Sequence, residues 1–306
     1  MDKNLQIVVH NTETGELFYT EEHFSKLGGF TTYEPSNEAK KKYRKNLRNQ
    51  QSLSRELGGF VKVLYYNNEV LYGNDLELSR ATVTRLLMLS TYLDYDNNLV
   101  LEPPKTKKQA EEEINPMKRK DIQYVLGLGD KPFKTFMKEI THANILIKEG
   151  KVYKLSSEYF YRGETSKDIY FSKMYVDTVR ELYASTSVRK HSTLSYVFQL
   201  MPFVHWKTNI IVADRVCGVD DMKQLNIYDI CELLGLETTK ASVSSIKKEL
   251  LSFKITRAGE ELYLFNYLVV GGANGERECY VVNPLVYNSM SDMNDFKEVV
   301  GHMWVN

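Results

Sequence analysis

Lysines at helical spacing are the residues of this chain whose chemistry is easiest to infer. Lys131, Lys134 and Lys138 recur every three or four residues, so in a helix they share one face. The apolar residues interleaved with them would form the buried face: Phe133, Phe136, Met137 and Ile140. Ammonium groups on an exposed face neutralise phosphates or donate to acceptor atoms of guanine. The pattern therefore predicts a helix over 131–143 that contacts DNA.

A second helix of the same kind is predicted over 239–253. Val243, Ile246 and Leu250 would point inward. The outer face would carry small polar and basic side chains: Thr239, Lys240, Ser244, Lys247 and Lys248. Hydroxyl groups bond to phosphates or base edges, so this face also suits a major groove. The alternative for both helices is an ordinary solvated face without a ligand.

Three further basic groups extend the predicted DNA surface. The first is a helix over 36–57 with seven basic and two acidic residues (7 − 2 = +5), in which Lys41, Arg44, Lys45 and Arg48 are the candidate contacts. It either follows a phosphate backbone or packs as a solvated helix. The second is the run Lys118, Arg119 and Lys120. The third is Arg277, beside the GGANG segment, which either enters a minor groove or ends a flexible hairpin.

The elements that must position these lysines follow one plan twice. A short helix (DIQYVLGLG, IYDICELLG) leads through a turn at Gly127 or Gly235 into the second helix. Glycine suits such a sharp turn because it adopts positive φ without strain. Two strands follow each time: ILIK and KVYKL, then about 261–270 and 278–283 around GGANGE. This order predicts a winged helix-turn-helix.

Two sequence blocks also repeat upstream of these motifs. Residues 80–101 align without a gap with 191–212 (191 − 80 = 111), which pairs Asn98 with Asn209. The repeat indicates an internal duplication. The predicted fold is α+β and helix-rich, with two tandem winged helix-turn-helix domains. The boundaries are 1–57 for an N-terminal hairpin and basic helix, 58–163 for the first domain, 164–190 for a helical linker, 191–290 for the second domain and 291–306 for a C-terminal tail.

The segments GGFVKVLYYNNEVL, LSRATVTRLLMLSTYLDYDNNLVL and KVYKLSSEYFYRG resemble winged-helix replication proteins of plasmids and phages of Gram-positive bacteria, the RepL-like initiators. The resemblance covers 58–163 well and 190–290 loosely. That family's wing ends in an Asn-Pro phrase, which is missing from the first repeat and present in the second at Asn283 and Pro284. The resemblance implies binding to origin or operator DNA. The duplication departs from an initiator with a single winged helix.

Other classes of protein find little support in the sequence. Forty acidic and forty basic residues cancel, so only their distribution suggests a nucleic acid. Three irregularly spaced cysteines predict reduced, packed thiols in a cytoplasmic protein, and no signal peptide or apolar span is apparent. Scattered histidines, the lack of a phosphate-binding loop and the lack of a nucleophile constellation predict no enzyme, no metal and no cofactor.

Two functions remain open from the sequence. The first is a sequence-specific binder of double-stranded DNA in a phage or plasmid, acting as replication initiator or transcriptional regulator. Host replication or transcription proteins would be its further partners, with no membrane, and the chain would be a monomer or homodimer. The second is a winged-helix module that docks a host or phage enzyme without binding DNA.

Overall fold

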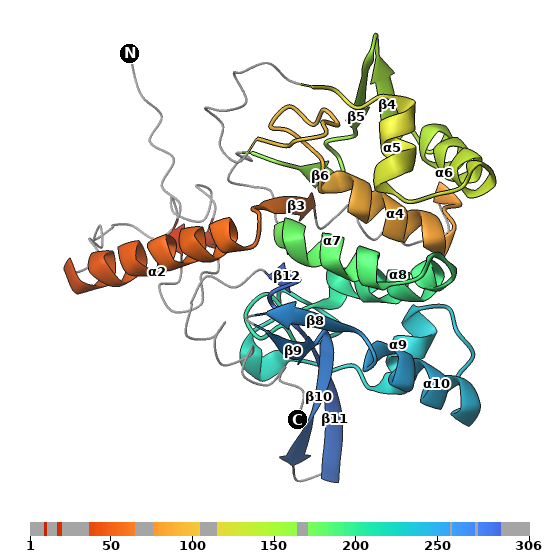
Figure 1. The fold of residues 1–306 in the computed structure, drawn as a ribbon. Coiled ribbons are helices and arrows are strands. Elements are labelled where there is room, and N and C mark those ends of the chain that lie inside the picture. Colours follow the sequence, from red (N-terminus) through yellow and green to blue (C-terminus); the bar gives the residue numbers. More distant parts are fainter. Residues whose placement is uncertain are drawn as a thin grey trace.

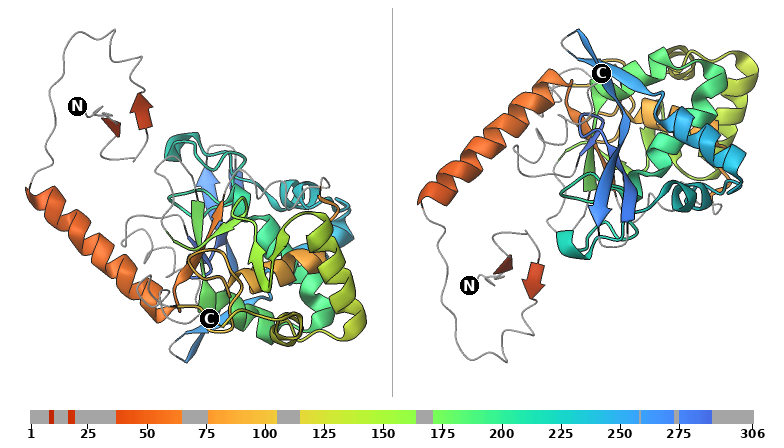
Figure 2. Two further views of the ribbon diagram at one scale, coloured as in Figure 1. Left: turned by 90° about the horizontal axis from the view of Figure 1, so that it is seen from above. Right: turned by 90° about the horizontal axis from the view of Figure 1, so that it is seen from below.

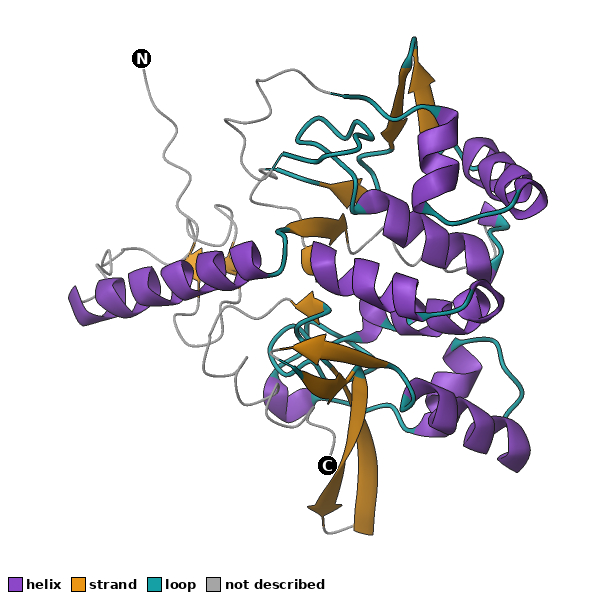
Figure 3. Ribbon diagram, in the orientation of Figure 1, coloured by secondary structure: helices purple, strands orange, loops and turns teal. Residues whose placement is uncertain are grey.

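A computed structural model describes residues 9–10, 17–19, 37–64, 76–104, 115–163, 171–257, 259–272 and 275–288. Within them the fold is mixed α+β, with eight α-helices and small antiparallel sheets (Figures 1 and 3). No helix in this part of the chain is long and apolar enough to cross a membrane.

A four-stranded antiparallel sheet lies at the centre, in the order β12-β7-β3-β6. Its strands are β3 (Phe60–Leu64), β6 (Phe160–Tyr161), β7 (Phe171–Tyr175) and β12 (Tyr287–Asn288). β3 and β7 are 111 residues apart (171 − 60 = 111), and their register places Lys62 opposite its own counterpart, Lys173. β6 pairs with β3 as β12 pairs with β7. An approximate two-fold axis therefore passes between Lys62 and Lys173.

The two lysines at this axis share their surroundings symmetrically. The Lys62 ammonium lies 4.5 Å from the ring centroid of Phe171, and the Lys173 ammonium lies 5.7 Å from that of Phe60. Lys173 also donates to Gln50 of the preceding helix. Burial, and secondly the charge of Lys62, lower the pKa of Lys173.

The helices that follow β3 and β7 in the chain join the two halves. α4 (Arg80–Ser90) packs against α8 (His191–Gln199), and α7 (Val176–Ser185) packs against α4. α4 begins where the Ser79 hydroxyl accepts a hydrogen bond from the Thr82 amide, and its residues 82–90 are all buried. Such complete burial suits a helix that lies between two halves of one core.

Each half continues with the predicted helix pair and hairpin. Unit one, residues 80–161, contains α5 (Arg119–Val125), α6 (Asp130–His142), β4 (Leu146–Glu149) and β5 (Val152–Leu155). Unit two, residues 191–288, contains α9 (Ile227–Leu233), α10 (Lys240–Leu250), β8 (Lys254–Arg257) and β9 (Glu260–Tyr263). The hairpins have equal lengths at a constant offset of 108 residues (254 − 146 = 108). The turn glycines have matching φ angles of +59° at Gly127 and +63° at Gly235.

Hydrogen bonds confirm the repeat and correct its alignment by one residue. Asn97 and Asn209 both have positive φ, and each donates from Nδ2 to two carbonyls. The acceptors are Leu155 and Phe160 in unit one, and Val282 and Tyr287 in unit two, at a constant offset of 127 (282 − 155 = 127). Asn209 therefore corresponds to Asn97, and the ungapped pairing with Asn98 is wrong, because the turn of unit two is one residue longer.

Unit two contains a ribbon that unit one lacks. β10 (Phe265–Gly272) and β11 (Gly275–Val282) pair along their whole length and extend from the body (Figure 1). In unit one the Leu99 amide donates to Tyr153 of β5, whereas the equivalent Ile211 amide donates to Tyr280 of β11. The predicted strands at about 261–270 and 278–283 are thus confirmed by β10 and β11. The prediction missed the hairpin β8–β9, which directly follows α10 as β4–β5 follows α6.

The outer segments agree with the sequence predictions in part. β1 (Val9–His10) pairs with β2 (Leu17–Tyr19), which confirms the N-terminal hairpin for those residues, and α2 (Asn37–Glu56) confirms the basic helix. The segment predicted as a helical linker contains strand β7 before α7, because Phe171–Tyr175 completes the central sheet. The predicted helix in the tail at 291–306 and the N-cap at Ser36 lie outside the described residues.

Candidate nucleic-acid interface

α6 has the two-faced character that its sequence predicts. It follows the turn at Gly127 and begins after Gly129. Its apolar residues are buried: Phe133, Phe136, Met137 and Ile140. Lys131, Lys134 and Lys138 are exposed. The core side chains fix the rotation of the helix about its axis, so the three ammonium groups face solvent together.

A groove beside α6 gathers further basic groups. It has a volume of about 500 Å³ and is lined by Arg119, Lys134, Met137, Lys138, Thr141 and His142. The Arg119 guanidinium lies 4.9 Å from the ring centroid of Phe133, which holds it over the start of the helix. No acidic residue lines this groove. Its chemistry therefore fits an anion such as a phosphate group.

Two residues of this groove were missed by the sequence analysis. Thr141 and His142 lie three and four residues beyond Lys138, so they continue the same helical face. Of the predicted basic run, Arg119 lines the groove, and its neighbours Lys118 and Lys120 are exposed at the start of α5.

α10 presents a weaker version of the same face. Thr239 is its N-cap, with the hydroxyl accepting from the Ser242 amide. Lys240, Ser244 and Lys248 are exposed, as predicted. Over equivalent windows, residues 118–142 carry six basic and three acidic side chains (6 − 3 = +3), whereas residues 226–250 carry three basic and four acidic ones (3 − 4 = −1).

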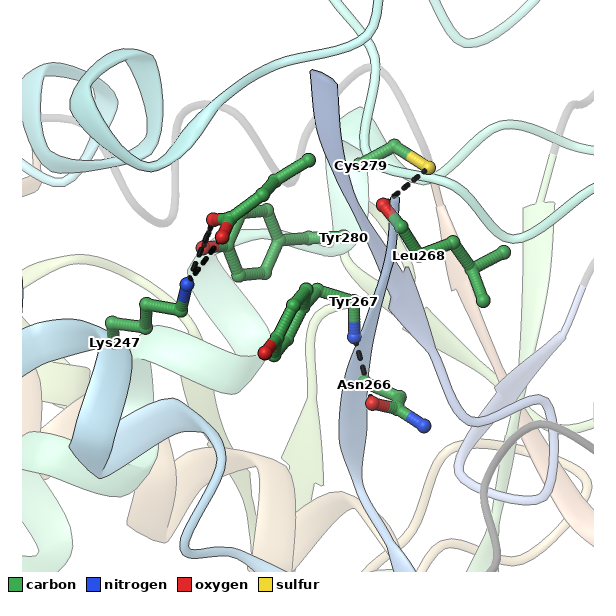
Figure 4. A network of polar contacts seen from close by, with 7 residues as sticks. Lys247, Asn266, Tyr267, Leu268, Cys279 and Tyr280 are labelled. Atoms are coloured by element: carbon green, nitrogen blue, oxygen red, sulfur yellow. Dashed lines mark hydrogen bonds and ion pairs between the residues drawn. The ribbon is translucent and has the colours of Figure 1, made fainter. Parts of the chain in front are cut away.

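Lys247 is turned away from that face, toward the ribbon. Its ammonium lies 2.6 Å from Oε1 and 2.8 Å from Oε2 of Glu278, and 4.3 Å from the ring centroid of Tyr267 (Figure 4). The Tyr280 hydroxyl donates to the same carboxylate at 3.0 Å. The hydrogen bond from Lys247 lowers the pKa of Glu278. The pKa of Tyr280 is raised, chiefly by burial and then by its hydrogen bond with Glu278. Lys247 therefore anchors α10 to β11.

The hairpins differ in how their charges are paired. In β4–β5, Lys154 pairs with Glu149 at 2.7 Å, while Lys148 and Lys151 remain exposed. In β8–β9, Lys254 pairs with Glu261 at 3.1 Å, and Arg257 pairs with Glu181 of α7. Arg277 belongs to β11 rather than to this hairpin, and its side chain lies outside the described residues.

The predicted basic residues do not all lie on one side. α6 and α10 lie on the same side of the molecule, whereas α2 extends from the opposite side (Figures 1 and 2). Lys41, Arg44, Lys45 and Arg48 are exposed on α2. The structure therefore groups the helix-pair lysines with one another and separates the α2 cations from them.

A larger cavity has the opposite charge. It measures about 690 Å³ and lies between the turn at 95–98 and the strands β4 and β5. Its charged lining residues are Asp96, Glu149, Lys154 and Glu158. Three carboxylates against one ammonium disfavour a polyanion, so this cavity is not a candidate DNA contact.

The described residues hold no group of three or more His, Cys, Asp or Glu side chains arranged to bind a metal ion. The three cysteines form no disulfide; Cys231 and Cys279 are buried and Cys217 is half-buried. Burial raises the pKa of all three thiols.

Comparison with known proteins gives no relative: no protein-family model, no curated protein and no solved structure matches this chain.

Proposed function

We propose that the chain is built from two tandem winged-helix units and binds double-stranded DNA through α6 and α10. The exposed basic face of α6, beside a groove lined by cations without any acidic residue, carries the proposal. Lysine and arginine at this spacing neutralise successive phosphates. The placement of α10 on the same side of the molecule supports contact with a second stretch of the same duplex.

In this proposal the two units make unequal numbers of phosphate contacts. α6 and the start of α5 supply most of the phosphate contacts. α10 presents Thr239, Lys240, Ser244 and Lys248 to base edges and phosphates, with Lys247 bound to Glu278 instead. The recognition helices would enter major grooves about one helical turn apart, roughly 34 Å. The resemblance to RepL-like proteins favours a plasmid or phage initiator or regulator.

Selection of bound fragments from the organism's DNA tests the proposal. The recovered fragment is then titrated with the full chain at about 50 mM and about 200 mM salt. With four phosphate contacts the affinity should fall about a hundredfold between these concentrations. A fragment beside iterated repeats indicates replication initiation, and one over a promoter indicates transcription control.

Recovery of no specific fragment, or binding that is insensitive to salt, would contradict the proposal. Such a result favours the other function, a module that docks a host or phage enzyme. Lys131→Ala, Lys134→Ala and Lys138→Ala together provide the matched variant, since all three side chains are exposed and their removal leaves the core intact.

A further inference from the structure

The start of α4 touches the helix pairs of both units. Ser79, its N-cap, donates from its amide and its hydroxyl to Oε2 of Glu139 on α6, at 3.0 and 2.9 Å. Arg80, the next residue, donates from Nη2 to the Leu234 carbonyl at the C-cap of α9, at 2.8 Å. Two consecutive residues thus contact α6 of unit one and α9 of unit two.

Arg80 occupies a position that disfavours a cation. It is the first residue of α4, where the positive end of the helix dipole repels its charge. Its guanidinium instead reaches the negative C-terminal end of α9 in the other unit. It is held there by a second bond, from Nη1 to the Tyr196 hydroxyl at 3.0 Å, and lies over the Tyr196 ring. The contact with the other unit offsets the local cost.

A matching contact exists on the other side of the axis. The Tyr183 hydroxyl donates to the Leu126 carbonyl at the C-cap of α5, at 2.8 Å. Leu126 and Leu234 are equivalent (234 − 126 = 108). Tyr183 stacks on His191, the first residue of α8, with ring centroids 4.3 Å apart. Burial raises the pKa of Tyr183, so its hydroxyl stays protonated and donates. The first helix of each pair, α5 or α9, therefore ends at a carbonyl that accepts a hydrogen bond from α7 or α4, the helices that join the two halves.

We infer that Arg80 and Tyr183 are positioning residues that fix the separation and orientation of α6 and α10, and so make the protein selective for the spacing of two DNA half-sites. The part concerning DNA rests on the proposed function. The part concerning the two helix pairs is independent of it. Neither residue contacts DNA in this scheme; both act through the carbonyls that end α5 and α9.

A distance measurement without DNA tests the mechanical part. Spin labels are attached at Thr135→Cys and Ser245→Cys, which are exposed on α6 and α10, in a Cys217→Ser background. The full chain should give one narrow distance distribution. Arg80→Ala should broaden or shift it, because the C-cap of α9 loses its donor. Arg189→Ala, which removes an exposed arginine just before α8, is the matched control and should change nothing.

A spacing series tests the consequence for DNA. One and two base pairs are inserted between the half-sites of the selected fragment, each adding about 3.4 Å and about 34°. The natural protein should lose at least about tenfold in affinity, the cost of losing even one good base contact. Arg80→Ala should bind the natural and lengthened sites within about twofold of one another.

The outcomes separate the two proposals. If no fragment is bound but Arg80→Ala broadens the distances, the DNA function is wrong and the positioning role stands. If the natural protein prefers one spacing and Arg80→Ala keeps both that preference and the narrow distances, the positioning role is wrong. Tyr183→Phe, which removes one hydroxyl and keeps the ring, repeats the test should Arg80→Ala fail to fold.

Discussion

Units one and two share a backbone plan but differ at the position where the second helix is anchored. The buried faces of α6 and α10 match at an offset of 110 (243 − 133 = 110), so Glu139 on α6 corresponds to Glu249, and Lys247 on α10 corresponds to the buried Met137. Glu139 binds the start of α4, in the shared layer, whereas Lys247 binds Glu278 of the ribbon, which unit one lacks. The second helix is therefore anchored from a different position in each unit, by residues of opposite charge. The comparison teaches that the fold fixes the buried face of the second helix, and that the local sequence decides which of its other residues forms the anchor.

The two units also differ in the net charge of their helix pairs. Unit one has a net positive helix pair with a cation-lined groove. The positions in unit two equivalent to Arg119, Lys134 and Lys138 are Ile227, Ser244 and Lys248, so only one of these three cations is kept there. If the chain binds DNA, unit one should provide most of the electrostatic affinity.

The largest expected effect comes from replacing the exposed lysines of α6 by alanine, compared with the same replacement on the polar face of α10. Lys131, Lys134 and Lys138 together should contribute about three phosphate contacts, so their loss should reduce the slope of log affinity against log salt by about 2.7 and the affinity by about a hundredfold. Replacing Lys240, Ser244 and Lys248 should reduce the slope by at most about 1.8. Electrophoretic shift across a salt series measures both. A larger loss from the unit-two set would reverse the comparison.

His191, which occupies in unit two the position of Arg80 in unit one, should make the stability of the chain depend on pH. Burial, and secondly Arg85, lower its pKa to about 4, against 6.5 in the unfolded chain. Between these two values the unfolded chain binds a proton at His191 and the folded chain does not. Stability therefore falls as pH drops from 6.5 toward 4. The loss should be on the order of 3 kcal/mol.

Urea unfolding between pH 7 and pH 4.5 measures this dependence. The variant His191→Gln should have a flatter profile than the natural protein. Burial also lowers the pKa of His205, so some slope should remain in the variant. Identical profiles would show that His191 titrates normally in the folded chain.

Asn97 and Asn209 should be equally costly to replace if the two turns are equivalent. Each has two hydrogen bonds from Nδ2 to buried strand carbonyls. Asn97→Ala and Asn209→Ala should each lower the free energy of unfolding by about 2 kcal/mol, since a net hydrogen bond contributes about 1 kcal/mol. Asn98→Ala is the control for the corrected alignment. An effect of Asn98→Ala equal to that of Asn209→Ala would restore the ungapped pairing.

The smallest effect should come from the two anchors themselves. Glu278→Gln removes a partly exposed ion pair and should cost less than about 1 kcal/mol of unfolding free energy. Because Lys247 lowers the pKa of Glu278, this contribution is present above pH 4.5 and is lost as the carboxyl group protonates at lower pH. Glu139→Gln changes the acceptor of the Ser79 hydrogen bonds and leaves the ribbon untouched, and it should also lower the free energy of unfolding. Urea titrations at pH 7 and pH 3.5 measure both variants.

Local pattern was enough to predict the helices and the first hairpin. The buried residues of α6 and α10 repeat at helical spacing, and the turn glycines separate each pair of helices. The ribbon was not separable from the second hairpin, because β9 and β10 follow one another with only Leu264 between them. Alternation of side chains continues through such a junction, while the change of partner strand leaves no mark in the sequence.

The candidate interface was predictable only where neighbours in sequence decide it. The exposed lysines of α6 follow from their spacing. The orientation of Lys247 depends on Glu278, thirty-one residues away, and the contact of Arg80 depends on a carbonyl in the other unit. Partners brought together by tertiary packing have no periodic signature.

The facing lysines of the central sheet bear on how the two halves are able to change. In an assembly of two identical subunits, any substitution at the axis appears on both sides at once. Here each side is encoded separately, so Lys62 can change while Lys173 stays. The strands nevertheless keep the same residue at that point, while the helices above them already differ, with arginine at 80 and histidine at 191. The two strands have themselves diverged around it, since only phenylalanine (60 and 171) and lysine (62 and 173) are common to both.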